Sequence, residues 1–134
     1  MLTLEQICDW LESQDPDLNN CIAVGGIDGN KEKYVGVYPL KPSGSTQRIC
    51  IGGVEQTRYQ QRSASILIHW TNRMSAAEAK ATSIYGLFYG LSGVIMDTTR
   101  VISADPGPAP IPVGKDVKGI CEYVIQIKFL YERT

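Results

Sequence analysis

The sequence predicts an α+β fold, a mostly antiparallel sheet of about five to six strands with two helices packed on it. Two segments carry apolar residues at helical spacing, and several others alternate as strands do. Their order along the chain is helix, strands, helix, strands. The most regular element is the final one, an alternating strand from Ile120 to Tyr131.

Length and composition indicate one ordinary globular domain spanning residues 1–134. A chain of this length buries roughly two-thirds of the surface that its unfolded form exposes. The composition is 43% hydrophobic and 20% charged, with a net charge of -1. This balance gives no strong signal for nucleic acid or an anionic membrane.

No apolar run is long enough to span a bilayer, and the N-terminus lacks the features of a signal peptide. We therefore expect synthesis in the cytoplasm and no membrane partner. The four cysteines lack the close spacing of a zinc or redox site. We expect no metal, no cofactor, and reduced, mostly buried thiols at these positions: Cys8, Cys21, Cys50 and Cys121.

The first helix is predicted to begin at Thr3, which has the spacing of a capping box with Gln6. Asp15-Pro16 ends it, because the residue before proline avoids the helical region. The apolar residues between them share one stripe: Leu4, Ile7, Cys8 and Leu11.

Three strands are predicted next. The apolar runs Cys21–Val24 and Tyr34–Tyr38 flank the turn signal Asp28-Gly29-Asn30, which favours a hairpin. Pro39–Ser45 is predicted as a loop, after which the chain returns as a strand at Arg48–Ile51.

Arg62–Trp70 is predicted as a central strand, because Leu67 makes even its second face partly apolar. The second helix is predicted from about Ala76 to Gly90, with Ser75 and Glu78 at capping-box spacing. Its apolar face carries the following residues: Ala77, Ala81, Ile84, Tyr85, Phe88 and Leu91.

Beyond this helix, Thr99–Ser103 is predicted as a strand. Residues 105–118 are predicted as an extended proline-rich arm or loop, because prolines cannot donate ladder hydrogen bonds inside a sheet. The last strand, about twelve residues at ~3.3 Å each, would span ~40 Å and project past its own sheet. Its inner face holds these residues: Cys121, Tyr123, Ile125, Ile127, Phe129 and Tyr131.

The sequence shows no catalytic constellation, so we predict no enzyme. His69 is the only histidine and is interpreted as a structural residue near a strand end. The glycine pairs at 25–26 and 52–53 lack the spacing of a phosphate loop and are interpreted as turns. The following carboxylates are interpreted as solvated surface groups: Asp97, Asp105 and Asp116.

Two other functions stay open at this point. A nucleic-acid-binding accessory protein would use a basic, aromatic surface, although interspersed surface charge explains the same residues: Arg48, Arg58, Arg62 and Arg73, with Tyr59. A small ligand-binding domain would centre on His69 and Trp70.

Several strings in the chain resemble a known family. They are Arg48-Ile-Cys-Ile-Gly-Gly, Ser65-Ile-Leu-Ile-His-Trp, Pro112-Val-Gly-Lys-Asp and Gly119-Ile-Cys-Glu-Tyr-Val-Ile-Gln-Ile-Lys-Phe-Leu-Tyr-Glu-Arg. In these strings and in element order, the chain resembles the minor capsid proteins of tailed bacteriophages and prophages, which are similar to tail terminators.

The resemblance implies a virion subunit that forms a homo-oligomeric ring, a hexamer, at the head–tail junction. Its partners would then be tail-tube and head-connector proteins. No catalytic residues come with such a family. Ring subunits need two different surfaces that meet head to tail. The candidate contacts lie in the first loop, around the third and fourth strands, in the proline segment and on the last strand: Pro39, Lys41, Pro42, Gln47, Arg58, Tyr59, Arg62, Pro106, Pro108, Pro110, Pro112, Lys115, Phe129 and Tyr131.

Overall fold

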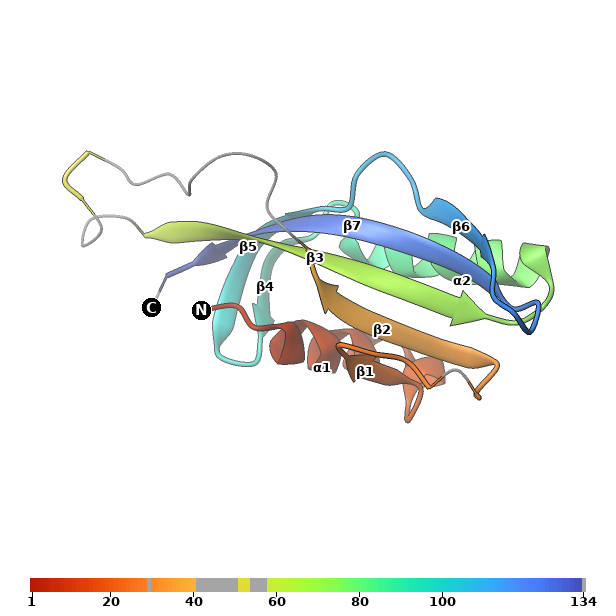
Figure 1. The fold of residues 1–134 in the computed structure, drawn as a ribbon. Helices are drawn as coiled ribbons and strands as arrows, with labels where there is room; N and C mark the ends of the chain where they lie inside the picture. Colours follow the sequence, from red (N-terminus) through yellow and green to blue (C-terminus); the bar gives the residue numbers. More distant parts are fainter. Residues whose placement is uncertain (29, 41–50, 54–57, 134) are drawn as a thin grey trace.

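The computed structural model describes residues 1–28, 30–40, 51–53 and 58–133. It confirms the α+β class and the predicted order of helices and strands (Figure 1). The elements are α1 (Leu4–Gln14), a short 3-10 helix (Pro16–Leu18), β1 (Ile22–Val24), β2 (Lys33–Pro39), β3 (Tyr59–Trp70), α2 (Met74–Phe88), β4 (Ser92–Met96), β5 (Thr99–Asp105), β6 (Ile111–Lys115) and β7 (Cys121–Glu132).

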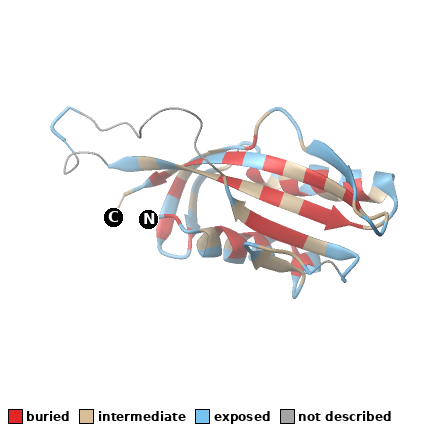
Figure 2. Cartoon of the chain, viewed as in Figure 1, coloured by how far each residue is buried: buried red, intermediate tan, exposed pale blue. Residues whose placement is uncertain are grey.

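Within the described residues the sheet has seven strands in the order β1-β2-β3-β7-β5-β4, and β6 pairs separately with β7. All pairings are antiparallel except that of β1 with β2. Both helices cover the same face, because their buried residues form one apolar cluster with the inner residues of β3 and β7. Figure 2 shows the resulting alternation of buried and less buried residues along these two strands.

The start of α1 is the predicted capping box. The Gln6 N–H donates to Thr3 Oγ1 at 3.2 Å, and the Thr3 N–H donates to Gln6 Oε1 at 3.1 Å. Two orphan backbone donors are thereby satisfied. Asp15 follows the helix in extended conformation, and its carboxylate accepts a hydrogen bond from the Asp17 N–H at 3.1 Å.

The predicted hairpin of the first two strands is wrong. β1 and β2 pair in parallel, with Ile22 opposite Val35. The Asp28 turn does form, since its carbonyl accepts the Lys31 N–H at 3.1 Å. A second reversal precedes it at Gly25, whose φ of 77° lies in the left-handed region. Two reversals return the chain to its original direction, which makes the pairing parallel.

The second predicted capping box is also wrong, because α2 begins one residue before Ser75, at Met74. Its N-cap is Arg73, which makes no side-chain capping bond. The Thr71 hydroxyl instead accepts a hydrogen bond from the Arg73 N–H at 3.3 Å. Four residues of the predicted apolar stripe are fully buried: Ala77, Ala81, Ile84 and Phe88. The helix ends at Phe88, two residues before the predicted end, so Leu91 of the predicted stripe lies beyond it.

Lys80 connects the two helices near the edge of the core. Its ammonium is ion-paired with Asp15 and lies 3.4 Å from the carboxylate of Asp17, both just beyond α1. The same ammonium lies 4.8 Å from the ring centroid of Trp70. The two carboxylates and the aromatic ring therefore compensate the positive charge of Lys80, whose side chain is largely removed from water.

β3 is the central strand that the sequence predicts, flanked by β2 and β7. The inner faces of β3 and β7 are buried as expected. However, β7 neither projects from the sheet nor forms its edge, because β5 and β6 pair along its second side. Phe129 and Tyr131 are 0% and 1% exposed, so these two predicted contact residues pack in the core.

The proline segment contains a strand that the sequence does not predict. Ile111–Lys115 forms β6, whose five residues are all exposed, at the edge beside β7. An edge position tolerates Pro112, because only one side of the strand needs a full ladder. β4 is a second unpredicted strand and pairs with β5. The strand predicted at residues 48–51 lies outside the described residues except for Ile51, which lies in a turn.

Two further observations complete the fold. Among the described cysteines, Cys8, Cys21 and Cys121 are free thiols, and the first and last are buried; Cys50 lies outside the described residues. Neither described helix has the length and apolar character needed to cross a membrane.

The two capping boxes give a matched test. Thr3→Ala should lower the free energy of unfolding by about 1 kcal/mol, because it removes an N-cap acceptor. Ser75→Ala should change it by less than about 0.5 kcal/mol, because Ser75 makes no capping bond and alanine favours a helix. Urea unfolding followed by circular dichroism measures both. Equal losses would contradict the assignment of the two helix starts.

Candidate assembly surface on the open face of the sheet

The face of the sheet turned away from the helices is not covered by any described helix or strand. Side chains on it come from alternate positions of β2, β3 and β7. The register aligns them in rows across the strands, and the central row is apolar. Leu67 of β3 lies between Gly36 of β2 and Val124 of β7, and Ile111 of β6 continues the row.

Gly36 gives this row its shape at the β2 end. A Cβ atom at this position would lie 2.6 Å from Tyr38 Cε2 and 2.9 Å from Ile27 Cγ2. The tyrosine ring and the isoleucine therefore lie directly over the glycine. Burial, followed by the charge of Glu122, raises the pKa of the Tyr38 phenol. The row is thus a partly desolvated band across four strands.

Beside this band, the side of β7 that faces away from β3 pairs with two different strands, one after the other. β5 pairs with β7 as far as Asp105 opposite Lys128, and β6 resumes at Ile111 opposite Val124. The loop of residues 106–110 bridges the gap. It is held by α2, because the Tyr85 hydroxyl donates to the carbonyl of Gly107 at 2.7 Å.

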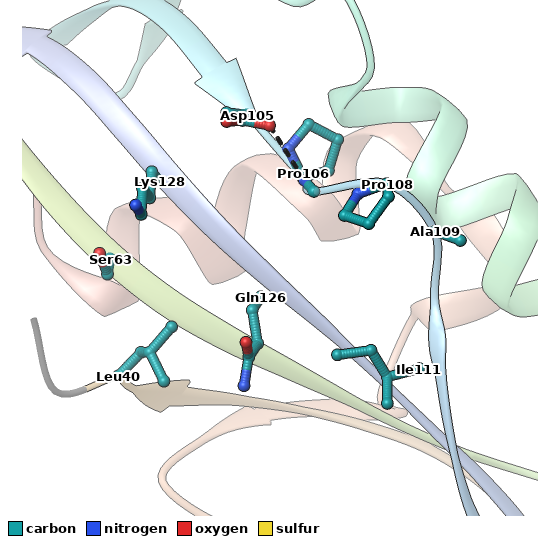
Figure 3. A pocket seen from close by; sticks show the side chains of 10 residues that line it. Leu40, Ser63, Asp105, Pro106, Pro108, Ala109, Ile111, Gln126 and Lys128 are labelled. Atoms are coloured by element: carbon teal, nitrogen blue, oxygen red, sulfur yellow. Dashed lines mark hydrogen bonds between the residues drawn. The ribbon is translucent and has the colours of Figure 1, made fainter. Parts of the chain in front are cut away.

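A groove of about 370 Å³ opens at this gap (Figure 3). One wall is apolar and comes from the proline loop and the strand ends, and polar side chains from β3 and β7 form the floor. The lining residues are Leu40, Ser63, Asp105, Pro106, Gly107, Pro108, Ala109, Ile111, Gln126 and Lys128.

Three of these residues carry free hydrogen-bond donors. Ser63 and Lys128 are cross-strand neighbours, and Gln126 lies two residues before Lys128 on the same face. Within the part of the chain that the structure describes, their side chains have no partner. The carboxylate of Asp105 is already an acceptor for the Gly107 N–H at 3.0 Å. The groove therefore presents unsatisfied donors, together with one ammonium, that of Lys128, and one carboxylate, that of Asp105, which are cross-strand neighbours.

A polar cluster lies at the other end of the open face. His69 is 1% exposed, and its Nδ1 lies 3.3 Å from Glu122 Oε2 while its Nε2 lies 3.6 Å from Asp116 Oδ2. Asp116 Oδ1 accepts backbone hydrogen bonds from Ile120 at 2.9 Å and Lys118 at 2.8 Å. The Ile120 bond is the main cause that lowers the pKa of Asp116, and the Lys118 bond and the nearby His69 add to it.

This cluster corrects one interpretation and agrees with another. Asp116 is not an isolated solvated carboxylate, because the turn between β6 and β7 brings it against His69, far away in sequence. His69 is a buried residue near the end of β3, as predicted. No group of three described histidine, cysteine or acidic residues is placed to hold a metal ion.

The candidate contact residues fall into different environments. Pro106, Pro108 and Pro110 belong to the groove loop, where Pro106 is buried and Pro108 is exposed. Pro112 and Lys115 are exposed on β6. Pro39 is exposed at the end of β2. Lys41, Pro42 and Gln47 lie outside the described residues.

The arginines near Tyr59 are not brought together as a single surface. Arg58 and Tyr59 are exposed at the start of β3, whereas Arg73 lies beyond its other end, at the start of α2. Arg62 is half-buried and donates through Nη1 to the carbonyl of Leu2 at 3.3 Å. Arg48 lies outside the described residues. No described observation therefore favours a nucleic-acid surface.

Neither His69 nor Trp70 is among the described residues that line the groove. Trp70 is 6% exposed and lies beneath the ammonium groups of Lys33 and Lys80.

The groove residues Ser63, Gln126 and Lys128 are missing from the predicted contacts, although the alternation of β7 places Gln126 and Lys128 opposite the core. The alternation of a single strand cannot predict that Ser63 of β3 and the proline loop lie next to Gln126 and Lys128.

Comparisons with known proteins add one informative match. A family model described as bacteriophage tail terminator protein matches residues 6–133. A solved structure is similar over 96% of this chain and 87% of its own, with 17% identity and a TM-score of 0.48. No curated protein matches the chain at a significant level.

The contact above Gly36 predicts that Gly36→Ala is destabilising, by about 1–3 kcal/mol, because Tyr38 and Ile27 must shift. Gly86→Ala is the matched control. It places the same methyl group on α2, where nothing lies within 4 Å, and should stabilise by about 0.5–1 kcal/mol. Chemical denaturation measures both values. A neutral Gly36→Ala would show that the ring does not rest on the backbone.

The lowered pKa of Asp116 predicts that part of the free energy of unfolding is lost in acid. Its pKa in the folded protein lies below the ordinary value of 3.8. The stability that it contributes is therefore complete above that value and is lost as the pH falls through the folded pKa. Asp116→Asn keeps an acceptor oxygen but cannot ionise, so its unfolding free energy should decline less steeply in this range. Identical pH profiles for wild type and variant would contradict the role of Asp116.

Proposed function

Because the chain belongs to the bacteriophage tail terminator family, we propose that it is a ring-forming subunit at the junction of tail and head. The observation that carries this proposal is the family match over residues 6–133, nearly the whole chain. The family is structural, and the protein is not an enzyme. In the proposed role, six copies form a ring within the virion as one of its minor components. The ring contacts the tail tube on one side and the head connector on the other.

The shape of the subunit is consistent with closed ring assembly. A ring needs two different surfaces that meet head to tail, and the rotation between them sets closure. The sheet separates two such surfaces, since helices cover one face and the other carries an apolar band and a groove. A protein with a single self-complementary surface would form a two-fold dimer instead, because that surface is used up when two copies meet.

We propose contacts at the exposed members of the predicted set. On the described chain these are Pro39, Arg58, Tyr59, Pro108, Pro112 and Lys115. Proline-rich and edge segments suit this role, because they lose little conformational entropy on docking. Lys41, Pro42 and Gln47 stay in the proposal from sequence alone.

Oligomeric state tests the ring. Light scattering after size-exclusion chromatography should give about six times the chain mass of 14.7 kDa for the protein alone, or a complex heavier than that after addition of tail-tube protein. Negative-stain images of the same peak should show rings. A protein that stays monomeric at high concentration, both alone and with tail-tube protein, would contradict the proposed function.

A further inference from the structure

The single histidine of the chain, His69, is buried between two carboxylates. Its Nδ1 lies 3.3 Å from Glu122 Oε2 at the start of β7, and its Nε2 lies 3.6 Å from Asp116 Oδ2. Asp116 belongs to the turn of residues 116–120, which we call the β6–β7 turn. The side chains of Glu122 and Asp116 are only 18% and 22% exposed, so water and salt screen both contacts weakly.

Only the charged form of the imidazole ring suits both of its neighbours. A neutral ring has one N–H donor, and its other nitrogen carries a lone pair. One carboxylate would then face that lone pair, and both groups are acceptors. The doubly protonated ring instead points an N–H at each carboxylate and attracts both. Nε2 is also buried without a hydrogen bond from any described residue, so a lone pair there would have no donor.

Three further charged or titratable groups lie around the ring, on β2, before β2 and in the β6–β7 turn: Tyr34, Lys31 and Lys118. Tyr34 is the cross-strand neighbour of His69, and the ammonium of Lys31 lies 5.5 Å from the centroid of the Tyr34 ring. Lys118 acts on Asp116 less strongly than His69 does. The counter-charge at the two ring nitrogens is therefore that of the two carboxylates.

The contact between His69 and Asp116 joins the β6–β7 turn to the end of β3. Asp116 organises the turn itself, because its Oδ1 accepts from the N–H groups of Lys118 and Ile120. The turn directly follows β6, whose five residues are all exposed at the edge beside β7. A change in the charge of His69 therefore acts on the attachment of this turn and, through it, on the edge strand.

We propose that His69 is a protonation-dependent latch, whose charged ring fastens the β6–β7 turn to β3 and whose neutral ring releases it. Folding selects the charged ring, so the stabilisation is complete at a pH where the unfolded chain also carries a charged histidine. It is lost as the pH rises and the folded ring gives up its proton. The latch lies within one chain and does not depend on the proposed ring.

Nitrogen NMR of protein labelled with ¹⁵N-histidine tests the latch directly, because one histidine gives one pair of ring-nitrogen signals. At neutral pH we expect both ring nitrogens to be protonated. Asp116→Asn keeps the shape of the side chain and removes its charge, so the ratio of charged to neutral ring at a given pH should fall about tenfold. Asp9→Asn, at an exposed position of α1, is the matched control and should leave this ratio unchanged.

Hydrogen exchange tests the release of the turn. The Cys121 N–H, directly after the turn, donates to the carbonyl of Thr71, directly after β3, at 2.9 Å. Its protection factor should fall about tenfold between about pH 6 and about pH 9, because release of the turn exposes this bond. The Asp15 N–H, bonded to the Leu11 carbonyl at the end of α1, is the internal control and should keep its protection.

A variant without a titrating ring completes the test. In His69→Gln the protection of the Cys121 amide should no longer change with pH relative to the control amide. The measurements on wild type and Asp116→Asn do not require this variant to fold. A wild-type ring with a single proton at neutral pH, or a charged fraction that Asp116→Asn leaves unchanged, would overturn the latch. Equal pH profiles for the two wild-type amides would overturn the release of the turn.

Discussion

The pairing of β3 with β7 is the contact on which the rest of the structure depends. Both strands have 12 residues, and their register runs from Tyr59 opposite Glu132 to His69 opposite Glu122. One face of this ladder supplies the floor of the core that both helices cover. Because side chains alternate, the same register assigns Ser63, Leu67 and Gln126 to the open face. The covered face and the open face are therefore two consequences of one set of backbone hydrogen bonds.

The candidate site comes from a break in the pairing along the second side of β7. A strand of this length has room for two neighbours in succession, and β5 and β6 each occupy one half. The chain must cross from one to the other, and it does so with a proline-rich loop that makes no ladder. Prolines suit this crossing, because they need no hydrogen-bond partner for a backbone N–H. The groove is the space that remains where the loop replaces a strand.

Charged side chains are unevenly distributed over the surface although the chain is nearly neutral overall. Within the helix layer, Lys80 is neutralised by Asp15, so the exposed charge of α1 is that of its carboxylates. On the open face Lys128 has no described partner. At the far end of that face the two carboxylates around His69 are instead satisfied within the molecule. A net charge of -1 therefore combines an acidic stripe on α1 with an open face on which Lys128 lies opposite Asp105.

The sequence by itself determined the features that depend on local spacing. The capping box at Thr3, the apolar stripes of both helices and the alternation of β3 and β7 are all read from residues a few positions apart. The tertiary structure alone decided the parallel pairing of β1, the burial of Phe129 and Tyr131, and the existence of β6. It also decided the meeting of Ser63, Gln126 and Lys128 in one groove. These features depend on which distant segments pair, and the free energy of that pairing comes from the whole core and not from any local pattern.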